Sequence, residues 1–178
     1  MAAVSSFFIS ATARLSMALA SASVPTTTTV TFSDLPVPPE PKIGPELIAH
    51  GKSVYLQNCA VCHGVNGDGR GEAATFLLPK PRNFVQANYR LRSTPMGHLP
   101  TDNDLFRAVS IGIAGTPMPP WRFHLSEEDR WAVVEYIKSF SPRFPNSNED
   151  RSTVDLGAPP VRNEATLAEG KALFTKMA

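Results

Sequence analysis

Helical periodicity of apolar residues is confined to the middle of the chain, between Ile43 and Phe144. Its first stretch, residues 44–59, opens with a Pro-Glu pair that suits the first turn of a helix. The apolar residues within this stretch fall roughly on one face of a helix. The pattern therefore predicts a helix that runs directly into Cys59.

Two further stretches show helical spacing, residues 101–113 and residues 125–140. Thr101 or Asp102 is a candidate N-cap for the former, because a short polar side chain can accept a hydrogen bond from the backbone of the first turn. Ser126 opens the latter and is followed three residues later by an acid, as in a capping box. We therefore expect a helix in each stretch.

The segments between these helices are rich in glycine and proline, above all residues 64–81. No stretch alternates clearly between apolar and polar residues, as half-buried strands do. We therefore expect an all-α fold with about three main helices separated by long loops. Such loops usually serve function, and they indicate that something other than side chains fills the middle of the domain.

The composition suits one globular domain with extensions, since the chain has 178 residues of which 42% are hydrophobic. Many of the 17 prolines lie at the edges of the helical region, in residues 35–45 and 142–160. The formal net charge of +1 gives no field that would attract nucleic acid or an anionic membrane. We therefore expect no nucleic-acid partner.

The ends of the chain differ in composition from its middle. Residues 1–22 contain apolar runs, a single charge and the sequence Ala-Ser-Ala, and they resemble a secretory signal peptide with cleavage near Ala22. Residues 23–42, rich in threonine and proline, are interpreted as an extended linker. The predicted domain covers residues 43–144, and residues 145–162 form a second linker.

Both cysteines of the chain lie in the motif Cys-Ala-Val-Cys-His, residues 59–63. A thioredoxin-like redox pair follows a strand, whereas a helix is predicted before this motif. A structural zinc site needs four ligands, but the chain has no further cysteine and only scattered histidines. The spacing suits a c-type haem, in which Cys59 and Cys62 bond to the two vinyl groups and His63 is the proximal iron ligand.

The loop between the second and third helices contains Gly-Thr-Pro-Met-Pro-Pro-Trp, in which prolines flank Met118. A thioether on a rigid loop suits the sixth position of a low-spin haem, whereas a core methionine would more often fill a gap between helices. Met118 is therefore the predicted distal ligand. Met96 is the alternative methionine, and His98 or His124 would give bis-histidine ligation.

These motifs, in this order, resemble a class I c-type cytochrome domain, and most closely the bacterial modules of one- or two-haem electron-transfer subunits. The resemblance covers the whole predicted domain. It implies a cytochrome c-like fold in which the helix before the haem motif crosses the last helix. Gly51 and Tyr55 would then pack against Trp131, Val134 or Tyr136.

The resemblance also implies roles around the haem. A proline carbonyl accepts the second N–H of the proximal histidine in such domains, and Pro79 or Pro81 is placed for this bond. Donors to the haem propionates are expected between the two axial ligands. The candidates are Arg82, Tyr89, Arg90, Arg92 and, through its indole N–H, Trp121.

A glycine-rich segment, residues 66–72, resembles a calcium-binding loop in its alternation of Asn66, Asp68 and glycines. It lacks the later bidentate glutamate that such a loop requires. We expect its glycines instead to let the backbone pass close to the haem edge.

We therefore expect an exported electron carrier with one haem c in this chain, working in a periplasmic respiratory or redox chain. Both axial positions are filled in this interpretation, and no nucleophile–base pair indicates catalysis. The partners would be redox proteins, with a membrane or periplasmic oxidoreductase complex as one setting. The alternatives are a haem-bearing subunit of a larger oxidoreductase, and a peroxidase or sensor with an open sixth site.

The end of the sequence repeats part of the first helix. Residues 170–178, Gly-Lys-Ala-Leu-Phe-Thr-Lys-Met-Ala, match residues 51–59 in their glycine, lysine and apolar positions. The first copy reaches its haem cysteine eight residues after the glycine. We therefore expect a second haem motif at or soon after position 179 of a longer protein, with residues 163–178 beginning a second, truncated cytochrome c domain.

Overall fold

The computed structural model describes residues 36–146 and 151–177. All regular structure within these residues is helical and none of them forms a strand, which confirms the expected all-α fold. The α-helices are α1 (Pro45–Asn58), α2 (Ala60–His63), α3 (Asp102–Ile111), α4 (Glu127–Lys138), α5 (Arg143–Asn146) and α6 (Glu164–Met177). Two short 3-10 helices, η2 (Glu72–Phe76) and η3 (Trp121–Phe123), lie in the connections.

No helix in this described part of the chain is both long enough and apolar enough to cross a membrane. The expected signal peptide, residues 1–22, and residues 23–35 of the first linker lie outside the described residues.

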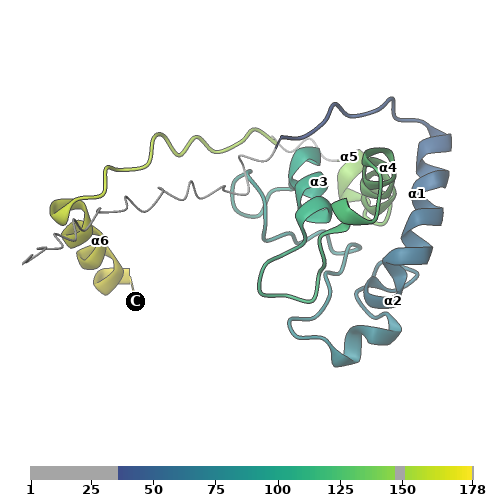
Figure 1. Ribbon diagram of the computed structural model, residues 1–178, viewed down its shortest axis with the longest axis horizontal. Helices are drawn as coiled ribbons and strands as arrows, with labels where there is room; N and C mark the ends of the chain where they lie inside the picture. Colours follow the sequence, from purple (N-terminus) through teal and green to yellow (C-terminus); the bar gives the residue numbers. More distant parts are fainter. Residues whose placement is uncertain (1–35, 147–150, 178) are drawn as a thin grey trace, which may run out of the picture. The chain divides into compact units, whose positions relative to one another are not determined.

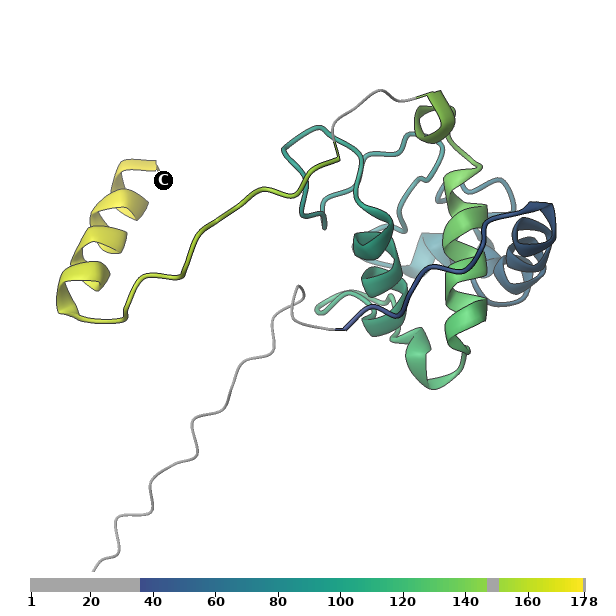
Figure 2. The ribbon, with the colours of Figure 1, turned by 90° about the horizontal axis from the view of Figure 1, so that it is seen from above.

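The helix that leads into the cysteine motif packs directly on the last long helix of the domain. α1 and α4 lie side by side (Figures 1 and 2), with Gly51 at their contact. A Cβ added to Gly51 would overlap the backbone carbonyl of Ala132 and would lie 3.1 Å from Cβ of Tyr136. Only glycine permits so close an approach of the two backbones. The contact fixes the end of α1, and hence the cysteine motif, relative to α4.

Both α3 and α4 begin with a capping box. Thr101 Oγ1 accepts a hydrogen bond from Asp104 N at 3.1 Å, and Asp104 Oδ2 accepts one from Thr101 N at 3.0 Å. Ser126 and Asp129 form the same pair of bonds, at 3.0 and 3.1 Å. These bonds satisfy backbone N–H groups that the first turn leaves unpaired. The predicted start at Ser126 is confirmed, and Thr101, rather than Asp102, is the N-cap of α3.

An aromatic core joins the three main helices. Tyr55 of α1 is fully buried, and its hydroxyl donates to the carbonyl of Gly64 at 2.7 Å. Its ring lies edge-on to Tyr136 of α4, with 5.3 Å between the ring centroids. Phe106 of α3 stacks on Trp131 of α4 at 4.4 Å. Tyr136 therefore makes the contact expected between the first and last helices, whereas Trp131 packs on α3.

Parts of both predicted linkers are held on the domain. Val37, in the segment before α1, packs against the core. After α5, the guanidinium of Arg151 pairs with the carboxylate of Asp102 at 3.1 Å. Val154 N donates to the carbonyl of Ser93 at 2.8 Å. The parts of both linkers that adjoin the domain therefore pack on its surface. By contrast, none of the residues of α6 is buried.

Candidate haem site

The cysteines and the histidine of the motif lie where α1 ends and α2 begins. Cys59 is the C-cap of α1, and its backbone N–H donates to the carbonyl of Tyr55 at 2.8 Å. The single turn of α2 then carries Cys62 and His63. Because a helix leads into the motif and no strand adjoins it in the described residues, the setting is not that of a thioredoxin-like pair.

The thiol of Cys59 is buried, with 8% of the residue exposed. Burial raises the pKa of this thiol to about 12, so the thiolate is disfavoured at neutral pH. Disulfide exchange and zinc binding both use the thiolate. The environment of Cys59 therefore argues against a redox-active dithiol.

His63 is held in one orientation and one tautomer. Its Nδ1 lies 3.0 Å from the carbonyl oxygen of Arg82. Since a carbonyl can only accept, Nδ1 carries the proton and Nε2 keeps its lone pair for a metal. The imidazole stacks on Phe84 with 4.4 Å between the ring centroids. Burial lowers the pKa of His63, which favours the neutral, metal-binding form.

The carbonyl that accepts from His63 corrects one expectation from the resemblance. Neither Pro79 nor Pro81 makes this bond, and Arg82, the next residue along the chain, makes it instead. The carbonyl of Pro81 is turned toward Gly69, where an added Cβ would lie 2.8 Å from it. The path of the backbone past this glycine therefore decides which carbonyl faces the histidine.

Met118 is carried by a tight turn that follows α3. Ile113 N donates to the carbonyl of Met118 at 3.2 Å. Thr116 Oγ1 accepts from Met118 N at 3.2 Å and donates to the carbonyl of Ile113 at 2.8 Å. Gly112 enters the turn with φ +68°, and a Cβ there would lie 2.7 Å from the carbonyl carbon of Pro119. The turn is therefore as rigid as its prolines predict.

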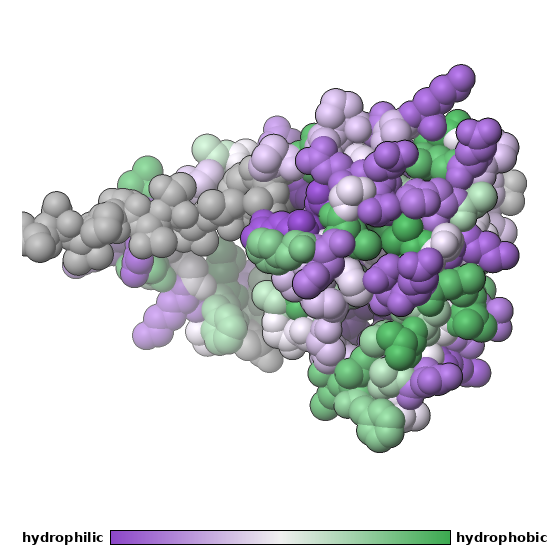
Figure 3. Space-filling view, turned by 45° about the vertical axis from the view of Figure 1, so that its right-hand side comes forward, coloured by the Kyte–Doolittle hydropathy of each residue, from purple (hydrophilic) through white to green (hydrophobic). Residues whose placement is uncertain are grey.

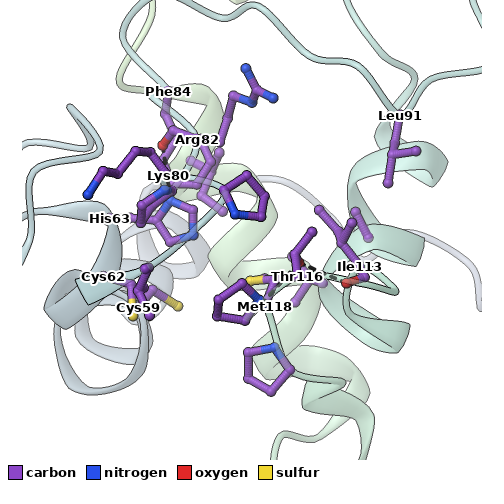
Figure 4. A pocket seen from close by; sticks show the side chains of 18 of the residues that line it. Cys59, Cys62, His63, Lys80, Arg82, Phe84, Leu91, Ile113, Thr116 and Met118 are labelled. Carbon is purple, nitrogen blue, oxygen red and sulfur yellow. Dashed lines mark hydrogen bonds between the residues drawn. The ribbon is translucent and has the colours of Figure 1, made fainter. Parts of the chain in front are cut away.

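A pocket of about 330 Å³ joins the cysteine motif to this turn. This volume lies within the range of about 300–1,000 Å³ that is usual for ligand and cofactor sites. The cysteines and His63 come from the α2 side, and Met118 comes from the turn after α3 (Figure 4). The lining is mostly apolar, and it contains several site residues expected from the sequence, namely Cys59, Cys62, His63, Pro81, Arg82, Met118 and Trp121.

The alternative sixth ligands lie away from this pocket. Met96 is 91% exposed and does not line it. His98 and His124 do not line it either. Of the methionines in the described residues, only Met118 reaches the pocket.

Tyr89 lines the pocket, and its hydroxyl is buried. This hydroxyl has no hydrogen-bond partner among the described residues. Burial raises the pKa of Tyr89, so its phenol remains a neutral donor. Arg82 lines the same pocket and is close enough for its charge to act on this hydroxyl. A neutral donor beside a guanidinium suits a carboxylate such as a haem propionate. Arg90 also lines the pocket, whereas Arg92 donates to the carbonyls of Tyr89 and Pro95.

None of residues 66–72, the glycine-rich segment, lines the pocket. Its glycines instead let the loop pack against the rest of the chain. A Cβ on Gly67 would lie 2.7 Å from the ring of Phe140, and one on Gly71 would overlap the carbonyl of Val61. The glycines therefore allow close packing within the protein.

Phe84 and Thr116 are among the pocket residues that had no role in the sequence-based prediction. Phe84 stacks on His63, and nothing in the aperiodic loop around it signals this role. Thr116 closes the Met118 turn, and its signal is its position between glycine and proline, where a hydroxyl often bonds to the nearby backbone.

Several exposed apolar side chains lie next in sequence to residues that line the pocket. Phe76 and Leu78 are 88% and 84% exposed and flank Leu77, which lines the pocket. Val61 and Val65, in and just after α2, are exposed as well. Apolar groups gather at the lower edge of the domain in Figure 3. Exposed apolar groups gathered in one place often mark an interaction surface.

Comparisons with known proteins identify two longer relatives. Over 105 residues, or 58% of this chain, the sequence is 29% identical to the thiosulfate dehydrogenase of Stutzerimonas stutzeri (strain A1501) and covers 30% of it. The structure matches a chain of the reducing HAO-like protein complex of Kuenenia stuttgartiensis with a TM-score of 0.68 and 40% identity. That match covers 79% of this chain and 60% of the other. The chain therefore spans less than two thirds of the length of either relative.

A family comparison covers the site itself. Residues 48–141, more than half of the chain, match the cytochrome c family. The match includes the cysteine motif, the Met118 turn and α4, and the family implies a covalently bound c-type haem. Together with the structural match, it confirms the expected cytochrome c-like fold. This chain belongs to the cytochrome c family.

Proposed function

We propose that this domain transfers single electrons through a c-type haem bonded to Cys59 and Cys62, with His63 and Met118 as axial ligands. The observation that carries the proposal is that the motif at residues 59–63 and Met118, which lie far apart in the sequence, line one mostly apolar pocket. The bound haem would supply a one-electron couple at its iron.

The protein prepares His63 for the proximal position. The Arg82 carbonyl fixes the tautomer and makes the imidazole a stronger ligand. Burial keeps the ring neutral. On the opposite side, a methionine sulfur from Met118 would raise the reduction potential relative to a second nitrogen ligand. The apolar lining acts in the same direction, because it disfavours the additional charge of the oxidised state.

Tyr89 and Arg82, which both line the pocket, would orient the haem. Tyr89 and Arg82 offer a hydroxyl donor and a cation to a carboxylate, and Trp121, which also lines the pocket, offers an N–H. Charge-assisted hydrogen bonds of this kind are the stronger ones. They support a single orientation of the haem in the pocket.

Comparing two methionine variants tests the axial ligand. Met118→Ala should give a high-spin ferric spectrum and should bind added carbon monoxide when reduced. Met96→Ala, at an exposed position, is the control and should leave the spectrum unchanged. A low-spin, ligand-inert Met118→Ala protein would contradict the proposed ligand. Carbon monoxide binding by the unaltered protein would favour a peroxidase or sensor instead.

Covalent attachment is tested separately. Acid–organic extraction should leave the haem on the unaltered polypeptide, because two thioether bonds hold it. A variant in which both Cys59 and Cys62 are serine should lose its haem in the same extraction. Free release of haem from the unaltered protein would contradict the proposal.

We further propose that the domain is the electron-transfer part of a larger oxidoreductase system in the periplasm, and that it is not itself the catalyst. One relative is a dehydrogenase and the other belongs to a HAO-like complex, which supports such a setting. The exposed Phe76 and Leu78 would contact a redox partner beside the pocket. The haem-loaded protein should co-purify with a redox enzyme from the periplasmic fraction. Its recovery only from the cytosol would contradict this location.

We also propose that α6 begins a second cytochrome c module, with its own haem, in the full-length protein. Gly170 and the apolar residues three and four positions after it correspond to Gly51, Val54 and Tyr55 of α1. A second Cys-x-x-Cys-His motif at or soon after position 179 would complete the correspondence. The full-length gene product should then contain two haems per polypeptide. A ratio of one, with no such motif within about a dozen further codons, would reject the second module.

A further inference from the structure

A cluster of five charged side chains lies where the chain enters and leaves the domain. Glu40 comes from the segment before α1, and Asp102 from the first turn of α3. Glu135 and Lys138 come from α4, and Arg151 follows α5. Carboxylate oxygens of the three acids lie within 4.8 Å of one another. The cluster therefore joins both flanking segments to the two helices of the core.

Two basic side chains, Lys138 and Arg151, pair with these acids. Lys138 Nζ lies 2.6 Å from Glu135 and 3.2 Å from Asp102. The two terminal nitrogens of Arg151 approach the two oxygens of Asp102 at 3.1 and 3.4 Å. Lys138 thus pairs with two of the three acids and Arg151 with one, so the cluster contains a set of ion pairs.

The pair between Arg151 and Asp102 is bidentate. Its two parallel N–H···O bonds form the fork arrangement that is specific to arginine and carboxylate. The same guanidinium also donates to the carbonyl of Pro100 at 3.3 Å. The side chain of Asp102 is only 19% exposed, so solvent screens this pair less than it screens a pair at an open surface.

A backbone bond three residues later continues this attachment. Val154 N donates to the carbonyl of Ser93 at 2.8 Å. Ser93 is itself fixed, because its N and Oγ both donate to the buried carboxylate of Asp104 at 2.9 Å. Leu91, two residues before Ser93, lines the pocket. The segment that leaves the domain is therefore attached to the loop that forms one wall of the pocket.

We propose that Arg151 anchors a clasp, formed by residues 151–154 on Asp102 and Ser93, that sets the point at which the chain leaves the domain. With the clasp closed, Val154 is the last anchored residue, and residues 155–163 form the tether to α6. Without the clasp, the tether would begin after α5 and comprise residues 147–163. A shorter tether raises the effective concentration of what it carries, here by about two- to threefold from the change in length. The clasp would thus hold the next part of the polypeptide close to this domain.

The test is amide hydrogen exchange at Val154 in the haem-loaded protein. In the unaltered chain this amide should be protected by its bond to Ser93. Arg151→Gln should speed its exchange at least tenfold, while the exchange of the core amide of Val133 and the haem spectrum remain unchanged. Arg162→Gln is the matched control, because Arg162 is an exposed arginine of the same linker. An unprotected Val154 in the unaltered chain, an unchanged rate in Arg151→Gln, or equal effects of both variants would overturn the clasp.

Ionic strength gives a second, independent readout. At about 1 M salt the screening length falls to about 3 Å, so an ion pair contributes less. Added salt should speed the exchange of Val154 in the unaltered chain and have little further effect in Arg151→Gln. Equal sensitivity to salt in both proteins would show that Arg151 does not hold the segment. Neither readout depends on whether a second haem module exists.

Discussion

Two helices of this chain, α1 and α6, share a short sequence pattern in different surroundings. Both are 14 residues long, and both contain Gly-Lys followed by an apolar and an aromatic residue at the same spacing. α1 buries Gly51, Val54 and Tyr55, whereas α6 buries none of its residues. The sequence pattern therefore specifies a helix in both places, whereas burial of its apolar face requires a packing partner, which only α1 has among the described residues.

The surroundings of the two glycines show the difference most directly. A Cβ on Gly51 would overlap the carbonyl of Ala132, whereas a Cβ on Gly170 would meet nothing within 4 Å. At the N-termini of the two helices it is α6, and not α1, that has the additional bond. The side chain of Asn163 caps α6 by accepting from Thr166 N at 2.9 Å, whereas no side chain caps α1. α1 is thus stabilised by its neighbours, and α6 by local bonds.

The largest contrast is expected from the aromatic residues. Tyr55→Ala should lower the free energy of unfolding of the domain by about 3–5 kcal/mol, because it leaves a cavity at a fully buried site. Phe174→Ala, at the equivalent position of α6, should change it by less than about 0.5 kcal/mol, because Phe174 is 74% exposed. Urea unfolding, followed through the haem spectrum, measures both. Similar losses in the two variants would mean that α6 packs on the domain.

The two glycines should respond to alanine with opposite signs. Gly51→Ala should destabilise the domain by about 1–3 kcal/mol, because the new methyl group forces α1 away from α4. Gly170→Ala should instead stabilise α6 by up to about 1 kcal/mol through helix propensity. Unfolding midpoints measure the first effect, and backbone chemical shifts of α6 measure the second. A loss of helix in α6 on Gly170→Ala would show that its glycine face is already occupied.

The helices were predictable because their signals are local. Apolar spacing and the cap at Ser126 lie within a few residues of each other, and the structure has α4 starting where they indicate. The same signals cannot say whether a helix is buried, as α1 and α6 demonstrate. Burial depends on a second element such as α4, which is distant in the sequence.

The site was predictable where its residues carry their own chemistry. The motif at residues 59–63 and the proline-braced Met118 both reach the pocket, although ligation by Met118 stays a prediction. The carbonyl of Arg82 was missed, because any carbonyl has the same chemistry and only the path of the backbone selects one. The stacking of Phe84 on His63 was missed because nothing in the aperiodic loop around Phe84 indicates which residue its ring contacts.

Removing a helix cap should affect α6 without affecting the domain. Asn163→Ala should cost α6 about 1 kcal/mol and lower its helix content, because the helix has no buried side chains to compensate. Ser126→Ala should cost the domain a similar amount in unfolding free energy while leaving α4 fully helical, since α4 is packed in the core. Circular dichroism and backbone chemical shifts distinguish the two results. Loss of helix from α4 would show that packing does not hold it.

The smallest effect is expected from the acid in the segment before α1. Burial, and next the carboxylate of Asp102, raise the pKa of Glu40 above its usual range, and Glu135 adds to this while Lys138 opposes it. A group whose pKa is raised by folding favours the folded state below its unfolded pKa of about 4.3, and that contribution is lost as the pH rises through the folded pKa. Ionised Glu40 therefore works against folding at neutral pH.

Glu40→Gln should therefore raise the free energy of unfolding slightly at about pH 7, and with it the unfolding midpoint. The gain should be less than about 1 kcal/mol, because solvent screens this group. At about pH 3.5 the difference should vanish, since Glu40 is then protonated and uncharged, as glutamine is. Glu169→Gln, in the exposed α6, is the control and should show no such dependence on pH. A lower midpoint for Glu40→Gln at neutral pH would mean that attraction to Lys138, rather than repulsion by Asp102, governs how the segment before α1 is held.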